Sequence, residues 1–203
     1  MPTPVGDARV AVSAETGPPV ATLVLGHGAG GGMGSADLVA LAEGLPPRGI
    51  TVVRVDQPWV VAGRKVAPAP VTLDRAWLAV VPQLRVEGRL VVGGRSAGAR
   101  VACRTATALG ASAVVAVSFP LHPPGSTRSR LDELLAAGVP TLVVQGDRDV
   151  FGRPEEFPVD GAQPYVLAAV PGDHGLRTGR HRPTPADLEP VVTVVADWLL
   201  ARP

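Results

Sequence analysis

Short apolar runs rich in valine, isoleucine and leucine alternate along the chain with longer stretches rich in alanine and leucine. This alternation is typical of βαβ units, in which helices cover a parallel sheet. The runs are almost continuously apolar, as expected for strands buried on both faces. The expected strands are residues 20–25, 50–55, 90–92, 113–118, 141–144 and 165–168, with 9–12 as an edge strand. The expected helices are residues 36–45, 73–84, 97–109, 130–137 and 186–201.

No composition shift, linker or internal repeat divides the 203 residues, so we expect a single α/β domain over residues 1–203. The proline-rich pieces 67–71 and 119–125 lie between expected elements and are interpreted as ordered loops. Hydrophobic residues make up 46% of the chain, which excludes general disorder. Nineteen basic residues against eighteen acidic ones leave a net charge of +1, so no nucleic-acid or membrane partner is expected.

The cysteine content and the apolar runs bear on compartment and cofactors. One cysteine, Cys103, excludes an internal disulfide and a cysteine-based zinc site. The first residues show no basic stretch followed by an apolar run, and no apolar run approaches the roughly 20 residues of a membrane helix. We therefore expect a soluble cytoplasmic protein, a monomer or small homo-oligomer, with no metal and no organic cofactor.

The segment Gly94-Arg95-Ser96-Ala97-Gly98 matches G-x-S-x-G between an expected strand and an expected helix. In that context a sharp turn can present the Ser96 hydroxyl above the sheet as a nucleophile. The flanking glycines are needed because a Cβ at either position would crowd the turn. Since ligands of parallel sheets bind beyond the carboxyl ends of the strands, the partners of Ser96 are expected there too.

A serine hydroxyl needs a base, and the base needs an orienting acid. His174 follows the last expected strand, and Asp147 and Asp149 both follow the strand before it. The order Ser96, Asp149, His174 is that of one class of serine hydrolases. We favour Asp149 over Asp147, although either could in principle reach His174.

The remaining requirement is a pair of backbone N–H groups that stabilise the oxyanion. The N–H of Ala97 follows the nucleophile directly and is one candidate. The glycine-rich loop after the strand 20–25 supplies the other, which we assign to Ala29. His27, in the same loop, is interpreted as a residue that pins the loop by hydrogen bonds.

With these motifs the sequence resembles the α/β-hydrolase superfamily. Within it, the sequence resembles a small capless group related to the testis-expressed and histone-acetyltransferase-complex hydrolase-like proteins, near the dienelactone-hydrolase-like branch. The matching segments are HGAG (27–30), AGR (62–64), GRSAGAR (94–100), PLHPPG (120–125), GDRDVFG (146–152) and DH (173–174). The resemblance implies a mostly parallel sheet of about six to seven strands with helices on both faces and no cap domain. It also implies that Ser96, Asp149 and His174 carry the triad.

The chain departs from these relatives at Ala97, where many have Met, and at the segment 57–59, Gln-Pro-Trp, where an aromatic residue, Pro and Tyr are common. Both changes concern the shape of the acyl pocket and leave the triad intact. Arg64 and His122 follow expected strands, and for each a substrate-facing role and a structural role remain open.

Arg95 and Arg100 flank the nucleophile turn. They hold loops by salt bridges or sense an anionic substrate, and we favour the structural role. Cys103 falls in the expected helix 97–109 and is interpreted as a small buried core residue.

Two other functions fit parts of the sequence. The segment 26–31 also matches the G-x-G-x-x-G of dinucleotide-binding domains, with Asp56 at the end of the next strand. That interpretation leaves Ser96, Asp149 and His174 unexplained. A hydrolase fold retained as a catalytically silent interaction scaffold is the other alternative, because fold alone does not imply function. We favour a serine hydrolase that cleaves a small ester, thioester or similar acyl compound.

Overall fold

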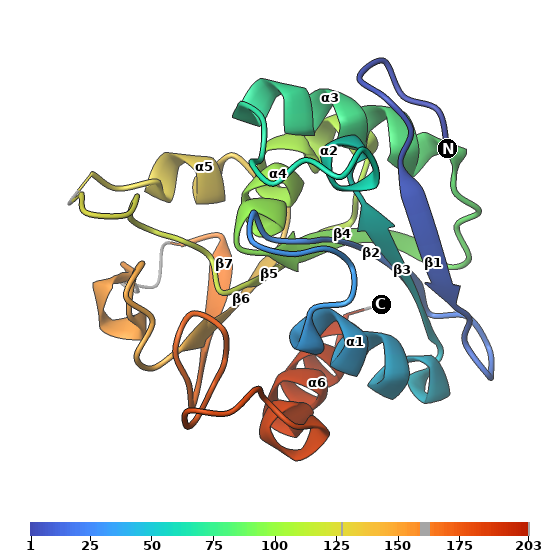
Figure 1. Cartoon of the computed structure of the whole chain (residues 1–203). Coiled ribbons are helices and arrows are strands. Elements are labelled where there is room, and N and C mark those ends of the chain that lie inside the picture. Colours follow the sequence, from blue (N-terminus) through green and yellow to red (C-terminus); the bar gives the residue numbers. More distant parts are fainter. Residues whose placement is uncertain (127, 159–162, 203) are drawn as a thin grey trace.

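The structure, a computed structural model, describes residues 1–126, 128–158 and 163–202. The chain forms one seven-stranded sheet with the order β1-β3-β2-β4-β5-β6-β7, in which β1 is antiparallel and every other pair is parallel (Figure 1). The strands are β1 Arg9–Ser13, β2 Ala21–Gly26, β3 Ile50–Asp56, β4 Arg89–Arg95, β5 Ala113–Val117, β6 Thr141–Gly146 and β7 Tyr165–Val170.

Helices cover both faces of the sheet. α1 and α6 lie on one face, and α2, α3, α4 and α5 lie on the other (Figure 1). Their bounds are α1 Ala36–Gly44, α2 Pro58–Val61, α3 Pro70–Val80, α4 Ala97–Thr105, α5 Leu131–Leu135 and α6 Pro185–Leu200. α6 begins with a reciprocal pair, because the Thr184 side chain accepts from the Asp187 N–H while the Asp187 carboxylate accepts from the Thr184 N–H.

Successive residues of the strands point to opposite faces, which gives the molecule two cores. In β5, Val114 and Ala116 pack with α3 and α4, whereas Val115 and Val117 pack with α1 and α6. All five residues of β5 are buried. This two-sided burial explains why the central strands are continuously apolar in sequence, and it confirms the predicted fold class.

The predicted elements are present, with differences at their ends. β4 extends to Arg95, past the expected end at 92, because glycines 93 and 94 allow the strand to continue against its neighbours. α3 begins at Pro70, inside a segment that we interpreted as a loop. Proline is favoured in the first turn of a helix, because the N–H groups there have no acceptor within the helix and the N–H that proline lacks is not needed. The short helix α2 was not predicted, because four residues carry too little periodicity to show it.

The described residues of the connection between β5 and β6 (118–126 and 128–140) form one short helix, α5, and no inserted domain that would cover the sheet. The carboxyl ends of β2, β3, β4, β6 and β7 therefore meet at an open edge, from which the candidate site is built. Within the described part of the chain, no helix has the length and apolar character needed to cross a bilayer.

Candidate active site

The turn between β4 and α4 holds Ser96 in an unusual backbone conformation, with φ 53° and ψ −112°. Positive φ is rare for a residue with a side chain and indicates local strain that the surrounding structure maintains. The Ser96 N–H donates to the Val117 carbonyl at 3.0 Å, which fixes the turn to the neighbouring strand. The sharp turn predicted from G-x-S-x-G is therefore present.

Close packing of backbone against backbone explains the glycine after the turn. A Cβ added to Gly98 would lie 2.2 Å from the Gly26 carbonyl oxygen and 2.4 Å from the Gly26 carbonyl carbon. These are backbone atoms of β2, so no side chain can move aside to make room. The first turn of α4 rests directly on the end of β2, and this contact sets where Ser96 stands.

We expect Gly98→Ala to lower the free energy of unfolding by about 2–4 kcal/mol, because the new methyl group forces β2 and α4 apart. Helix propensity alone would favour alanine at this position by about 1 kcal/mol. Gly34→Ala is the matched control, since a Cβ there meets nothing within 4 Å, and we expect a change below about 0.5 kcal/mol. Urea denaturation measures both; equal effects of the two variants would contradict the packing argument.

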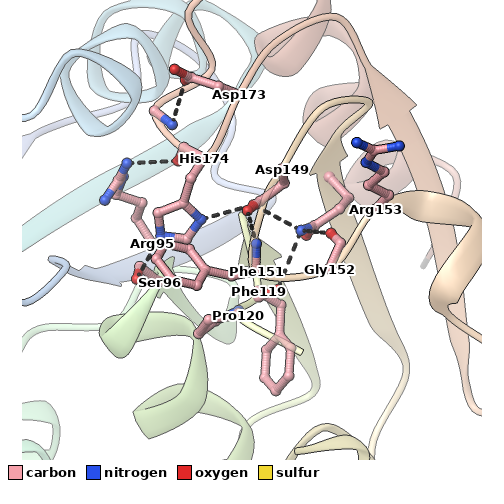
Figure 2. Close-up of polar contacts among 12 residues, drawn as sticks. Arg95, Ser96, Phe119, Pro120, Asp149, Phe151, Gly152, Arg153, Asp173 and His174 are labelled. Carbon is pink, nitrogen blue, oxygen red and sulfur yellow. Dashed lines mark hydrogen bonds and ion pairs between the residues drawn. The ribbon is translucent and has the colours of Figure 1, made fainter. Parts of the chain in front are cut away.

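Three side chains from three strand ends form a hydrogen-bonded chain (Figure 2). His174 Nε2 lies 3.0 Å from Ser96 Oγ, and His174 Nδ1 lies 2.8 Å from Asp149 Oδ2. The Asp149 side chain is fully buried and that of His174 is 18% exposed. The imidazole thus connects a solvent-accessible hydroxyl to a buried carboxylate, which is the arrangement that activates a serine.

Asp149 is held by more than the histidine. Its Oδ1 accepts from the Phe151 N–H at 2.8 Å, and its Oδ2 also accepts from Gln145 Nε2 at 2.9 Å. The Phe151 ring meets the His174 ring edge-on, with centroids 4.6 Å apart. These contacts fix the carboxylate and the imidazole plane together. Gln145 was missed from sequence, although a polar residue in the apolar strand β6 is a signal that could have indicated it.

Asp147 has a different role from Asp149. Its Oδ1 accepts from the Gly172 N–H at 2.8 Å, which ties the end of β6 to the loop after β7. Of the two carboxylates that follow β6, Asp149 is the one in contact with His174.

Arg95 links the nucleophile turn to the histidine loop. Its Nε donates to Asp37 Oδ2 at 3.0 Å. Its Nη2 donates to the His174 carbonyl at 2.7 Å (Figure 2). Asp37 lies in the first turn of α1 and is 4% exposed. A partly buried ion pair, in which the carboxylate is buried, therefore holds the backbone of His174 in place. Sequence reasoning missed Asp37, because an acidic residue in a first helical turn is common for local reasons.

We expect Arg95→Met to lower kcat for an activated ester by about 10²-fold with little change in KM, since a displacement of His174 near 1 Å can cost that much. Arg85→Met is the control, because Arg85 pairs with Glu87 before the start of β4, at the end of that strand opposite Ser96. Steady-state kinetics on both variants measures the effect. A similar loss in both, or a loss confined to KM, would contradict a positioning role for Arg95.

Ala29 and Ala97, whose N–H groups we predicted to form the oxyanion hole, line the same small pocket beside the turn. His27 lines it too and is buried. Its Nε2 accepts from the Gln57 N–H at 3.1 Å, so the ring proton is on Nδ1, which donates to the Gly28 carbonyl at 2.8 Å. His27 thus links the loop after β2 to the end of β3.

Burial lowers the pKa of His27 below its ordinary value of 6.5. The unfolded chain therefore binds a proton at His27 at higher pH than the folded chain does. We expect the neutral His27 to make its full contribution to the free energy of unfolding above about pH 6.5. This contribution is lost as the pH falls toward the lower pKa of His27 in the folded protein. Urea denaturation between pH 5 and 8 should show a smaller loss of the free energy of unfolding toward acid pH in His27→Gln than in wild type. An undiminished acid loss in His27→Gln would contradict this assignment.

The structure separates Arg64 and His122 from Ser96. Arg64 is exposed and lines a different cavity, of about 330 Å³, which Trp59 also lines. His122 Nε2 lies 3.1 Å from Glu156 and holds two loops together. Neither lines the cleft that contains His174.

Arg100 and Cys103 of α4 contribute to packing and to contacts between helices. Arg100 makes a two-pronged ion pair with Glu133 of α5, with N–O distances of 2.9 and 2.7 Å. Cys103 is buried, and burial raises the pKa of its thiol to about 12, so the thiol is unreactive at neutral pH.

The glycine-rich loop lacks the geometry of a dinucleotide site. α1 begins at Ala36, five residues beyond the third glycine of the motif. The Asp56 carboxylate accepts from the Met33 N–H at 2.7 Å and pairs with Arg9 at 2.6 Å. A buried carboxylate already engaged in this way is unsuited to bind a ribose hydroxyl.

An open cleft of about 930 Å³ lies beside His174, the middle residue of the hydrogen-bonded chain Ser96–His174–Asp149. The glycine-rich loop lines one wall, and Phe151, His174 and Arg182 line the other. Within the described residues, no cluster of His, Cys, Asp or Glu has the composition of a metal site. The cleft gives a molecule in solution access to His174 and to Arg95, the residue before Ser96.

Fold and site together define a hydrolase-type α/β architecture. A family model described as an α/β-hydrolase domain matches residues 19–197, and the chain therefore belongs to the α/β-hydrolase family. No curated protein matches the sequence.

Solved structures show the same fold. The chain is similar to an α/β serine hydrolase without a lid from Xanthomonas campestris, with 26% identity over 99% of this chain and 94% of the other and a TM-score of 0.73. An α/β serine hydrolase homologue from Coxiella burnetii has 19% identity, the same coverage and a TM-score of 0.72. A dienelactone hydrolase from Anabaena variabilis has 17% identity, covers 96% of this chain and 91% of its own, and has a TM-score of 0.66. The prediction of a fold without a cap domain is confirmed.

Proposed function

We propose that this protein is a serine hydrolase that cleaves a small ester or thioester through an acyl-enzyme. The observation that carries the proposal is the continuous chain from Ser96 Oγ through His174 to the buried Asp149, with distances of 3.0 and 2.8 Å. The membership in the α/β-hydrolase family and the likeness to a serine hydrolase from Xanthomonas campestris support it.

In the proposed mechanism, His174 Nε2 takes the Ser96 proton as Ser96 Oγ attacks the acyl carbonyl carbon. Asp149 keeps the proton of the neutral imidazole on Nδ1 and stabilises the imidazolium that forms. The proton then passes from Nε2 to the leaving alcohol or thiol as the ester bond breaks. Water, with His174 as base, attacks the acyl-enzyme and regenerates the Ser96 hydroxyl.

The N–H groups of Ala29 and Ala97 are assigned to the oxyanion. Ala97 is the first residue of α4, where backbone N–H groups lack helical partners, and both residues line the pocket beside Ser96. Such a donor pair stabilises the charge that develops on the carbonyl oxygen, and each donor contributes about 10²–10³ in rate.

The proposal extends to substrate size and setting. The open cleft and the absence of an inserted domain between β5 and β6 favour a short acyl group over a long chain that needs an enclosed tunnel. We place the protein in the capless group related to the testis-expressed and histone-acetyltransferase-complex hydrolase-like proteins, on the segments that resemble them. With a net charge of +1, we propose that it acts on a free small molecule in the cytoplasm.

Turnover of p-nitrophenyl acetate and butyrate by purified protein tests the proposal. We expect acetate and butyrate esters to be hydrolysed by wild type, and His174→Ala to lose at least about 10⁴-fold in kcat because Ser96 then lacks its base. A folded wild-type protein that turns over neither ester, nor any thioester of the same acyl groups, would overturn the assignment.

A further inference from the structure

The open cleft beside His174 continues the pocket of the oxyanion along the glycine-rich loop. Gly28 lines both spaces, the small pocket with Ala29 and Ala97 and the cleft with His174. In the proposed mechanism the carbonyl oxygen lies against the two alanine N–H groups, and the leaving group takes its proton from His174. His174 lines the cleft and neither alanine does. A leaving group that extends from the scissile bond past His174 therefore enters the cleft.

The charged side chains on the wall of the cleft leave one guanidinium without an acidic partner. Arg95 pairs with Asp37 at 3.0 Å, and Arg177 pairs with Asp173 at 2.8 Å. Arg182 is exposed, and no carboxylate of the described residues lies within ion-pair distance of it. Each carboxylate on the wall is thus matched by an arginine, and the surplus charge is positive.

The loop that carries Arg182 is held in place beside the cleft. Arg148 Nη2 donates to the Arg177 carbonyl at 3.1 Å and to the Thr178 carbonyl at 3.2 Å. Thr178 Oγ1 donates to Asp187 Oδ1 at 2.9 Å, which ties the loop to the first turn of α6. The surplus charge of Arg182 therefore has a fixed position relative to His174.

Apart from His174, the rest of the wall carries no charged side chain. Gly30, Gly31 and Gly34 line the side formed by the glycine-rich loop, and Phe151 adds apolar surface. A Cβ added to any of these three glycines would meet no atom within 4 Å, so this side leaves room for a ligand. Selection by charge in the cleft therefore depends on Arg182.

We propose, on the basis of the proposed function, that the leaving group of the substrate is negatively charged, an alcohol or thiol that bears a carboxylate or a phosphate. The leaving group lies in the cleft, and the guanidinium of Arg182 pairs with its anion. As the acyl group is transferred to Ser96, the proton from His174 goes to the leaving oxygen or sulfur. The product is the free alcohol or thiol, with its anion unchanged.

Aryl acetates that differ in the charge of the leaving group test the inference. 4-Acetoxybenzoate carries a carboxylate, 4-acetoxyphenyl phosphate carries a phosphate, and 4-acetoxybenzamide is the neutral counterpart of the benzoate. The kcat/KM of each ester is normalised to its hydroxide-catalysed rate, which corrects for the reactivity of the leaving group. We expect wild type to favour an anionic ester over the amide by about fivefold or more, and the better of the two identifies the anion. Raising NaCl to about 0.5 M should reduce this preference by screening.

Arg182→Met tests the contact, and Arg180→Met is the matched control. Both are exposed arginines of the same loop with no carboxylate partner among the described residues, but of the two only Arg182 lines the cleft. We expect Arg182→Met to bring the preference for the anionic ester near one, chiefly through KM. Arg180→Met should keep the preference within about twofold of wild type, because a charge outside the cleft is screened by solvent.

The outcomes separate the inference from the function beneath it. A wild-type preference near or below one overturns the anionic leaving group while hydrolysis of p-nitrophenyl acetate stands. An equal loss of preference in Arg182→Met and Arg180→Met overturns the contact with Arg182, and so does a preference that Arg182→Met retains. Folded wild-type protein that hydrolyses none of these esters, p-nitrophenyl acetate included, overturns the proposed function itself.

Discussion

Replacement of Ser96 by alanine is expected to lower kcat for p-nitrophenyl acetate by about 10⁴–10⁶-fold while the protein remains folded. The hydroxyl is the atom that bonds to the acyl carbon, and no other side chain can replace it at 3.0 Å from His174 Nε2. The φ of 53° at Ser96 is strained for any residue with a side chain, so alanine keeps the strain and isolates the loss of the hydroxyl. Steady-state kinetics and a denaturation curve on the same preparation measure both properties.

The matched control is Ser118→Ala. Ser118 also has a positive φ of 48°, and its hydroxyl is buried without a partner. We expect kcat in this variant to remain within a few-fold of wild type. A comparable loss in Ser96→Ala and Ser118→Ala would indicate a general effect on the fold and would contradict a nucleophilic role.

Asp149→Asn is expected to lower kcat by about 10⁴-fold, because an amide that donates toward Nδ1 stabilises the wrong imidazole tautomer. Asp147→Asn is the control at the other carboxylate of the same loop. Asp147 accepts from the Gly172 N–H, a bond that the amide oxygen of asparagine can still make, so we expect little change in kcat. Steady-state kinetics of the two variants measure the difference. A larger loss of kcat in Asp147→Asn than in Asp149→Asn would identify Asp147 as the acid that orients His174.

Much of this site could be predicted because its parts obey local rules. G-x-S-x-G predicts a turn, and the carboxyl-end rule of parallel sheets places Ser96 and His174 at one edge. The apolar runs predict the strands because both faces of the sheet are buried. The strand ends were less accurate: β4 continues through two glycines to Arg95, since backbone packing with β2 and β5 outweighs the weak strand propensity of glycine.

The contacts that a single sequence could not predict are those between distant residues. The Arg95–Asp37 pair joins positions 58 apart. The choice between Asp147 and Asp149 depends on which of two carboxylates in one loop turns inward, and spacing alone does not decide it.

An activated serine at position 96 is the central claim, and labelling with a fluorophosphonate probe tests it most directly. The probe reacts with serines that a neighbouring base has made nucleophilic, and peptide mapping identifies the labelled residue. We expect wild type to be labelled at Ser96 alone, Ser96→Ala to be unlabelled and His174→Ala to be labelled far more slowly. Well-folded wild-type protein that remains unlabelled would contradict the account and would leave the interaction scaffold as the better interpretation of the fold.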